Sequence, residues 1–134
     1  VLFAAAPAEA QAPRQGLPGR TLLDRFGLER CWSNQATIDV RSDVVRHLVA
    51  DEDVVVVQSR GGLVTVFDAQ SGVKLWDGQL ARDNQYSYPA VTNADAMFVV
   101  IGTTLYARDK YDGDELWSMR LPGVPSTSPT ADNN

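Results

Sequence analysis

Short hydrophobic runs alternate with short polar turns through the middle of the chain. The runs Val54–Val57 and Leu63–Phe67 are rich in β-branched and aromatic residues, and the turn Ser59–Gly62 separates them. A second turn, Asp68–Gly72, leads into the run Val73–Trp76. Asp and Ser side chains bond the amides of such a turn, and Gly adopts its left-handed position. The pattern therefore predicts two hairpins that share their middle strand.

The same succession of runs and turns returns further along the chain. Four residues recur at a spacing of 41, by subtraction of their numbers: Asp68, Gly72, Trp76 and Leu80 precede Asp109, Gly113, Trp117 and Leu121. The second copy has its runs and turns at Met97–Ile101, Gly102–Thr104, Leu105–Ala107, Asp109–Gly113 and Glu115–Ser118. A period of about 40 to 45 residues with several short strands per unit is the signature of a β-propeller blade. We therefore predict an all-β fold, a β-propeller of four-stranded antiparallel blades, with about two complete blades present.

The repeated turns carry a recognisable motif. It reads Val66-x-Asp68-x-x-Ser71-Gly72-x-x-x-Trp76 and then Ala107-x-Asp109-x-x-Asp112-Gly113-x-x-x-Trp117. This pattern resembles the pyrrolo-quinoline quinone (PQQ)-like repeat, the tryptophan-docking motif of the eight-bladed quinoprotein alcohol dehydrogenase-like propellers. The family has Ala first and Thr before the Gly, so Val66 departs from it, whereas Ser71 and Asp112 keep a side-chain oxygen in the turn. We expect Val66 to alter how tightly neighbouring blades dock.

Length and repeats together predict the organisation of the chain. Residues 1–20 are interpreted as a signal-peptide remnant and a disordered linker, and residues 21–134 as a partial propeller with repeats at about 48–89 and 90–129. A closed propeller needs at least four blades, and a repeat cannot bury its faces without neighbours. We therefore expect the chain to be a piece of a longer protein whose remaining blades, eight in all by the resemblance, complete the ring.

The first residues predict the location of the protein. Val1–Gln11 combines an apolar run with small residues, and Ala8 and Ala10 fit a secretory cleavage site. A disordered leader rich in Ala and Pro remains the alternative. No later stretch has the roughly 20 apolar residues that span a membrane. We expect an exported protein, periplasmic or associated with the cell envelope, with no transmembrane segment.

The segment ahead of the repeats predicts two further elements. Thr21–Phe26 fits a short helix capped by the Thr21 hydroxyl. Leu28–Ile38 is expected to supply the outer strand of a blade, because Trp32 imitates Trp76 at the end of such a strand. The other strands of that blade would come from the distant C-terminus of the complete protein and close the ring. Cys31 would be half-buried in this strand. Each Trp is expected to dock against a neighbouring blade and donate its indole N–H to a backbone carbonyl.

Charge and titratable residues exclude several kinds of site. The chain has 12 basic and 17 acidic residues, a net charge of −5, with no Lys/Arg cluster, so nucleic-acid binding is not expected. Because His47 is the single histidine and stands at a position that Pro89 takes in the next repeat, we do not expect it to act as a catalytic base. The acidic segment Asp109–Glu115 lacks the ligand spacing of a calcium loop and is interpreted as a hairpin turn. Tyr86 and Tyr88 lie in a loop between blades, where we expect packing in preference to ligand contact.

Two functions from different classes remain open. The first is a non-catalytic scaffold in the cell envelope that binds other proteins through propeller loops or edges and resembles outer-membrane assembly propellers. The second is a PQQ- and calcium-dependent alcohol or sugar dehydrogenase whose active site lies outside this chain. The compact 41-residue period favours the scaffold, because such dehydrogenases tend to have longer insertions between blades. We predict no catalytic, cofactor-binding or metal-binding residue here, and the motif residues are interpreted as structural.

Overall fold

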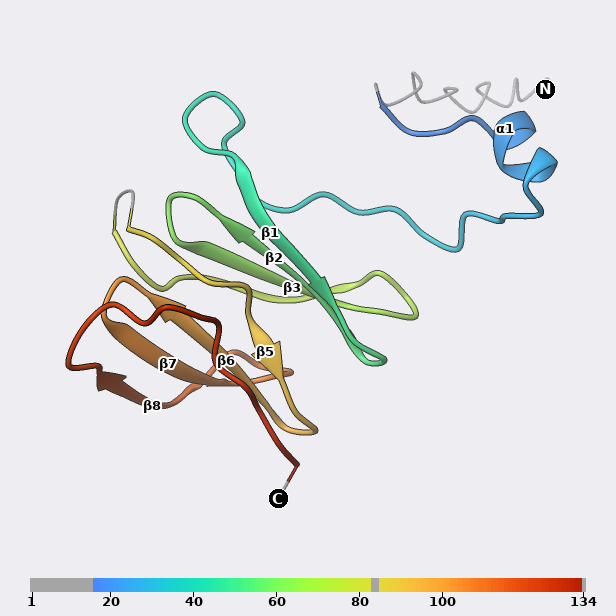
Figure 1. Ribbon diagram of the computed structural model, residues 1–134. Helices are drawn as coiled ribbons and strands as arrows, with labels where there is room; N and C mark the ends of the chain where they lie inside the picture. Colours follow the sequence, from blue (N-terminus) through green and yellow to red (C-terminus); the bar gives the residue numbers. More distant parts are fainter. Residues whose placement is uncertain (1–15, 83–84, 134) are drawn as a thin grey trace, which may run out of the picture. The chain divides into compact units, whose positions relative to one another are not determined.

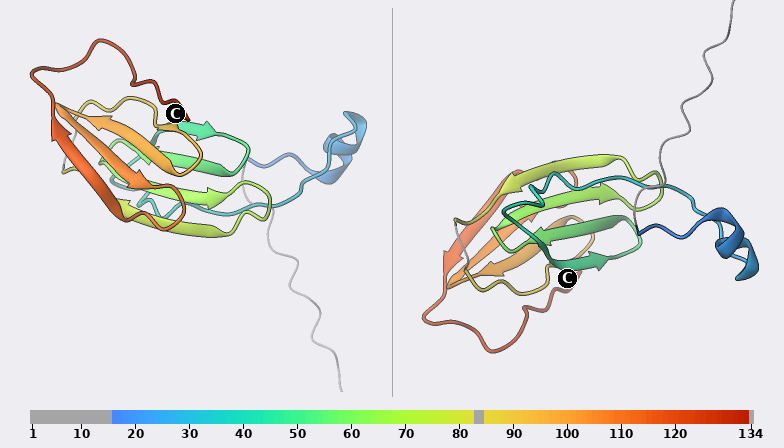
Figure 2. Two further views of the ribbon diagram at one scale, coloured as in Figure 1. Left: turned by 90° about the horizontal axis from the view of Figure 1, so that it is seen from below. Right: turned by 90° about the horizontal axis from the view of Figure 1, so that it is seen from above.

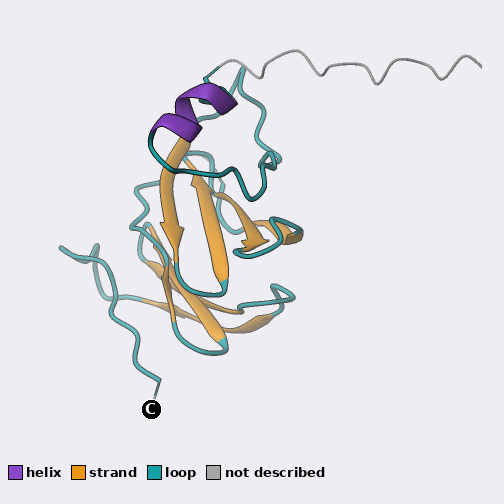
Figure 3. Ribbon diagram, turned by 90° about the vertical axis from the view of Figure 1, so that its right-hand side faces the viewer, coloured by secondary structure: helices purple, strands orange, loops and turns teal. Residues whose placement is uncertain are grey.

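The computed structural model describes residues 16–82 and 85–133. These residues form one short helix and eight strands (Figures 1 and 3). The elements are α1 (Arg20–Arg25), β1 (Val45–Ala50), β2 (Val54–Ser59), β3 (Leu63–Asp68), β4 (Lys74–Gln79), β5 (Val91–Thr92), β6 (Ala96–Ile101), β7 (Thr104–Asp109) and β8 (Glu115–Arg120). The chain divides into two compact units, Val1–Cys31 and Trp32–Asn134.

The first unit contains the helix that the sequence predicts, shifted by one residue. Gly19 is the N-cap of α1, its carbonyl accepts the amides of Leu22 and Leu23 at 3.1 Å, and no side chain caps the helix. The predicted cap at Thr21 is therefore wrong, because the helix starts earlier and places Thr21 in its first turn. Gly27 ends the helix at φ 64°, a left-handed conformation that suits glycine. No helix of the described residues is long and apolar enough to cross a membrane.

The second unit contains two four-stranded antiparallel sheets. Their strand orders are β1-β2-β3-β4 and β5-β6-β7-β8, so each strand pairs with its neighbour in sequence. The register shifts between Val66 and Phe67 in the first sheet and between Ala107 and Arg108 in the second. These irregularities occupy equivalent positions of the two repeats, so the repeat in sequence is a repeat in backbone geometry. The predicted fold of four-stranded propeller blades is confirmed, and two blades are present.

One face of the first sheet packs against the second sheet (Figure 2). Successive side chains of a strand point to opposite faces, so every second residue reaches this contact. A single buried cluster joins the two sheets and includes Val54, Val56, Val64, Val66, Met97, Val99 and Ile101. The sequence shows these strands as continuous hydrophobic runs, and the packing of the two sheets decides which face of each strand joins the cluster.

The other face of the first sheet is covered by the segment that follows Cys31. Trp32 lies against Phe67 with ring centroids 6.4 Å apart, and the Thr37 hydroxyl donates to Asp77 at 3.2 Å. No strand forms at Leu28–Ile38 among the described residues. The strands predicted to pair with it belong to a distant part of the complete protein, so this strand stays a prediction. The expectation that Cys31 is half-buried is wrong, since the residue is exposed.

Candidate functional site: the repeat turns and the contact between the sheets

The turn between β3 and β4 is held by the side chain of its first residue. The Asp68 carboxylate accepts hydrogen bonds from the Ser71 amide and the Ser71 hydroxyl, both at 2.7 Å, and from the Gln70 amide at 3.1 Å. Hydrogen bonds from Ser71, the amide first, lower the pKa of Asp68. Gly72 closes the turn at φ 72°, and its amide donates to the Asp68 carbonyl at 2.9 Å. The motif residues Asp68, Ser71 and Gly72 thus form one hydrogen-bonded unit.

The turn between β7 and β8 repeats this geometry. The Asp109 carboxylate accepts the amides of Tyr111 at 2.8 Å and Asp112 at 3.1 Å, and Gly113 closes the turn at φ 79°. Asp112 in turn accepts the Asp114 amide at 2.9 Å. The carboxylates of Asp109 and Asp112 therefore accept hydrogen bonds from backbone amides of their own turn, as in a hairpin.

Each of these glycines lies beneath a tryptophan ring from earlier in the chain. The Trp32 indole donates to the Ala69 carbonyl at 2.8 Å, and the Trp76 indole donates to the Lys110 carbonyl at 3.0 Å. A Cβ on Gly72 would stand 2.3 Å from the Trp32 ring, and one on Gly113 would stand 2.5 Å from the Trp76 ring. Both contacts require a residue without a side chain.

The remaining motif residues lie opposite the tryptophans within their own sheets. Val66 faces Trp76 across the β3–β4 pair, and Ala107 faces Trp117 across the β7–β8 pair. Val66 and Ala107 are fully buried, and Trp76 is 9% exposed. Trp117 is 45% exposed, because no turn among the described residues covers its ring. The effect of Val66 on docking between blades stays a prediction.

We expect Gly113→Ala to lower the free energy of unfolding by about 1–3 kcal/mol. The added methyl would both meet the Trp76 ring and hold a side chain at φ 79°. Chemical denaturation of the variant measures the loss. Gly123→Ala is the matched control, since nothing lies within 4 Å of its Cβ position. Equal stabilities of the two variants would contradict the close contact with Trp76.

A buried lysine joins the turns of the two sheets, and sequence reasoning missed it. The Lys110 side chain is 3% exposed, and its ammonium lies 2.9 Å from carboxylate oxygens of both Asp51 and Asp53 in the β1–β2 turn. It also donates to the Asn93 carbonyl at 3.1 Å, and the Thr92 hydroxyl donates to Asp51. We call Asp51, Asp53, Thr92, Asn93 and Lys110 the lysine cluster. The one sequence signal that could have pointed to Lys110 is the repeat, because it aligns Lys110 with Ala69 in the turn of the first copy.

The pKa values of the lysine cluster reflect competition between burial and pairing. Burial lowers the pKa of Lys110, but the hydrogen bonds that its ammonium donates to Asp53 and Asp51 outweigh burial and raise the pKa above its usual value. Burial raises the pKa of Asp51, but hydrogen bonds from Thr92, from Lys110 and from two turn amides outweigh it and lower the pKa to about 2. Lys110 is therefore an ammonium beside the ionised Asp51 carboxylate at neutral pH.

The lowered pKa of Asp51 predicts a loss of stability in acid. A group whose folded pKa lies below its unfolded value of 3.8 stabilises the fold above that value and loses its contribution as the pH falls towards the folded pKa. We expect the difference in unfolding free energy between the wild type and Asp51→Asn to be constant from pH 7 to about pH 5. It should then shrink between about pH 4 and pH 2. Urea unfolding across this range measures it, and a difference that does not change with pH would contradict the assignment.

Two polar side chains of the first sheet bind the loop that enters the second. The buried Gln58 amide donates to the Tyr88 carbonyl at 3.0 Å and accepts the Ala90 amide at 2.6 Å. The His47 ring Nε2 lies 2.8 Å from the Ser87 carbonyl. His47 therefore lies in β1 as a structural contact to this loop. Tyr88 is half-buried and donates to a backbone carbonyl of the C-terminal segment, whereas Tyr86 is 55% exposed.

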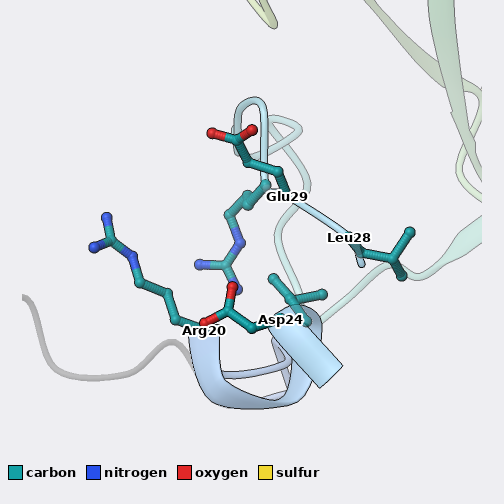
Figure 4. Close-up of a pocket in the computed structure, with 6 residues that line it drawn as sticks. Arg20, Asp24, Leu28 and Glu29 are labelled. Atoms are coloured by element: carbon teal, nitrogen blue, oxygen red, sulfur yellow. The ribbon is translucent and has the colours of Figure 1, made fainter. Parts of the chain in front are cut away.

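A hollow of about 540 Å³ lies within the first unit, and sequence reasoning did not anticipate it (Figure 4). Its lining comes from α1 and from the loop after it: Arg20, Leu23, Asp24, Leu28, Glu29 and Arg30. Arg30 is held there by a hydrogen bond to the Pro18 carbonyl. The lining contains two guanidinium groups and two carboxylates. Their charges cancel, so the hollow favours neither an anion nor a cation.

The described residues do not fit a calcium ion. Calcium takes six to eight oxygen ligands. The carboxylates of the repeat turns accept amides of their own turns, and no group of three or more His, Cys, Asp or Glu residues in the described chain could hold a metal. The expectation that this chain itself binds neither PQQ nor calcium stays a prediction.

A model of a known protein family matches part of the chain. Residues 23–88 match the family model described as "Outer membrane protein assembly factor BamB". The matched range includes the whole first sheet and the segment with Trp32. The resemblance to the PQQ-like repeat family that the motif predicts is confirmed.

Solved structures with a similar fold cover only part of this chain. BamB from Moraxella catarrhalis is 24% identical, with a TM-score of 0.48, over 55% of this chain and 23% of that chain. A europium-containing methanol dehydrogenase is 20% identical, with a TM-score of 0.47, over 57% of this chain and 15% of that chain. The aligned part of this chain thus spans less than a quarter of either protein. A comparison with curated protein sequences finds no match.

Proposed function

Starting from a chain that carries PQQ-like repeats of the BamB type, we propose that this protein is a non-catalytic propeller scaffold that binds other proteins in the cell envelope. The observation that carries the proposal is the family match over residues 23–88, whose description names a factor for outer membrane protein assembly. An assembly factor acts by binding proteins, so a match to it favours binding over catalysis. The proposal concerns the complete protein, because the chain spans only part of its structural relatives.

The described structure suits a scaffold in two ways. The sheets are tied together by the buried cluster, the tryptophan contacts and the lysine cluster, so the loops project from a rigid body. The connections between strands lie at the surface, where propellers carry their binding sites.

We propose that a further blade covers the outer face of β8. Every residue of β8 is exposed, and Leu116, Trp117 and Met119 are 45–51% exposed. The equivalent Trp76 is covered by the turn that contains Gly113. A neighbouring blade with such a turn would bury Trp117 in the same way.

Export to the cell envelope belongs to the same proposal. It is supported by the family description and by the leader-like pattern of Val1–Gln11. That segment lies outside the described residues, so the structure adds nothing to this point.

Affinity capture with the chain as bait tests the scaffold function. Envelope and cytoplasmic fractions of the producing cells are compared, and we expect one or a few envelope proteins to bind in stoichiometric amounts. In parallel, the complete protein is incubated with PQQ, calcium, an alcohol and an electron-accepting dye, and we expect no dye reduction. Dye reduction that requires both PQQ and the alcohol would contradict the scaffold and support the dehydrogenase.

A further inference from the structure

Acidic residues gather in the turns at one end of the strands of the second unit. The turns β1–β2, β3–β4, β5–β6 and β7–β8 lie at one end and carry Asp51, Glu52, Asp53, Asp68, Asp95, Asp109, Asp112 and Asp114. The opposite end holds the β2–β3 and β6–β7 turns, the start of β1 and the loop after β4 (Figure 1). That end carries Arg46, Arg60 and Arg82.

Backbone pairing brings these three arginines together. Val45 pairs with Ser59, and the Arg60 amide donates to the Val44 carbonyl at 2.9 Å, so Arg46 and Arg60 stand on adjacent strand ends. Arg82 follows Ala81, whose carbonyl lies 2.7 Å from the Cβ position of Gly62.

An exposed aromatic ring completes this end of the sheets. The Arg46 guanidinium lies 4.8 Å from the centroid of the Tyr86 ring, which is 55% exposed. We call Arg46, Arg60, Arg82 and Tyr86 the arginine surface. It therefore combines three cationic groups with an exposed ring that can pack against apolar atoms.

The guanidinium groups of the arginine surface have no carboxylate paired with them in the described structure. Within residues 16–82 and 85–133 none of them forms an ion pair, whereas Lys74, Arg108 and Lys110 all do. Asp43 lies beside Arg60, but its carboxylate accepts the amides of Val44 at 2.8 Å and Gly61 at 2.9 Å. Counting Asp83, which follows Arg82 in the sequence, two acidic residues stand against three arginines, so the net charge of this part of the chain is still positive.

A buried hydroxyl without a partner lies at the same place. Ser87 is 3% exposed, and its hydroxyl has no hydrogen-bond partner in the described structure. It lines a shallow depression together with Arg60 and Arg82. A buried polar group without a partner costs free energy that a ligand oxygen could recover after a small side-chain movement.

We propose that the arginine surface binds an acidic segment of a partner protein. Guanidinium groups form charge-assisted, bidentate hydrogen bonds with carboxylates, and Tyr86 offers a ring for an apolar side chain of the same segment. The depression is too shallow to enclose a small molecule, so an extended segment fits it better. Nucleic acid is disfavoured, because the net charge of −5 and the acidic opposite end repel a long polyanion. This inference rests on the proposed scaffold function and names the chemistry of its partner.

Peptide binding to the full chain tests the proposal. The probe is a fluorescein-labelled peptide of alternating glutamate and glycine with one central phenylalanine, and the control peptide has glutamine in place of glutamate. Fluorescence anisotropy is expected to show at least tenfold tighter binding of the glutamate peptide at low salt. Arg46→Gln, Arg60→Gln and Arg82→Gln should each weaken it roughly two- to fivefold, and the triple variant more than tenfold. Lys74→Gln, the same charge change at the opposite end, should leave it unchanged.

Three results would overturn the proposal. Equal binding of the two peptides would show that carboxylates are not recognised, and an equal loss in Lys74→Gln would show that net charge alone is responsible. Tighter binding of a single-stranded oligonucleotide of the same charge would identify a nucleic-acid surface instead. If the triple variant captures the envelope partners as the wild type does, this inference fails and the scaffold stands. If the wild type captures no protein yet binds the glutamate peptide, the scaffold fails.

Discussion

Replacing Trp76 with alanine is expected to lower the free energy of unfolding by about 3–5 kcal/mol. The side chain is 9% exposed, belongs to the cluster that joins the sheets and donates its indole N–H to the Lys110 carbonyl. The substitution removes this buried area, opens a cavity above Gly113 and leaves a buried carbonyl without its donor. Urea unfolding of the full chain, followed by a probe that does not depend on tryptophan, measures the loss.

Trp117→Ala is the matched control for this prediction. It stands at the same motif position, but its side chain is 45% exposed and no turn of the described residues covers it. We expect a loss below about 1 kcal/mol in this chain. Similar losses for the two variants would show that the motif tryptophans act within their own sheet and not through the neighbouring turn.

Lys110→Met is expected to lower the free energy of unfolding by about 3 kcal/mol. Methionine keeps most of the side-chain volume, so the change isolates the ammonium group. Without it, Asp51 and Asp53 face each other across a partly buried site with no cation between them. Asp51, whose side chain is 26% exposed, should carry more of the loss than Asp53, which is 51% exposed. Thermal and urea unfolding at pH 7 measure it.

Two further variants separate the lysine cluster from a general charge effect. Lys74→Met removes an exposed lysine that pairs with Asp77 at 2.6 Å, and its loss should stay below about 1 kcal/mol. Combining Lys110→Met with Asp51→Asn should cost less than the sum of the single changes, because each removes the same interaction. Additive losses in the double variant would contradict a direct pair between Lys110 and Asp51.

The strands and their turns could be predicted from the sequence because their determinants are local. Asp68 and Gly72 belong to one turn whose hydrogen bonds join residues three or four positions apart. The run of valines in β2 predicts a strand with both faces buried. The spacing of 41 then identified the second copy and with it the blade. Local reasoning has no such support at Leu28–Ile38. The resemblance of Trp32 to Trp76 predicts a strand there, but its pairing strands would come from a distant part of the complete protein. The described structure shows only the docking contact of Trp32 with the Ala69 carbonyl.

The contacts that join the two blades could not be predicted in this way. Lys110 meets Asp53 from 57 positions away, in a register that exists only once both sheets are folded and stacked. The arginine surface likewise depends on adjacent strand ends, because Arg46, Arg60 and Arg82 show no cluster along the chain. The sequence by itself determined the blades, their turns and the turn glycines, because turn hydrogen bonding and strand propensity act over a few residues. Tertiary structure alone decided which charges meet and which stay free, because electrostatic pairing depends on distance in space.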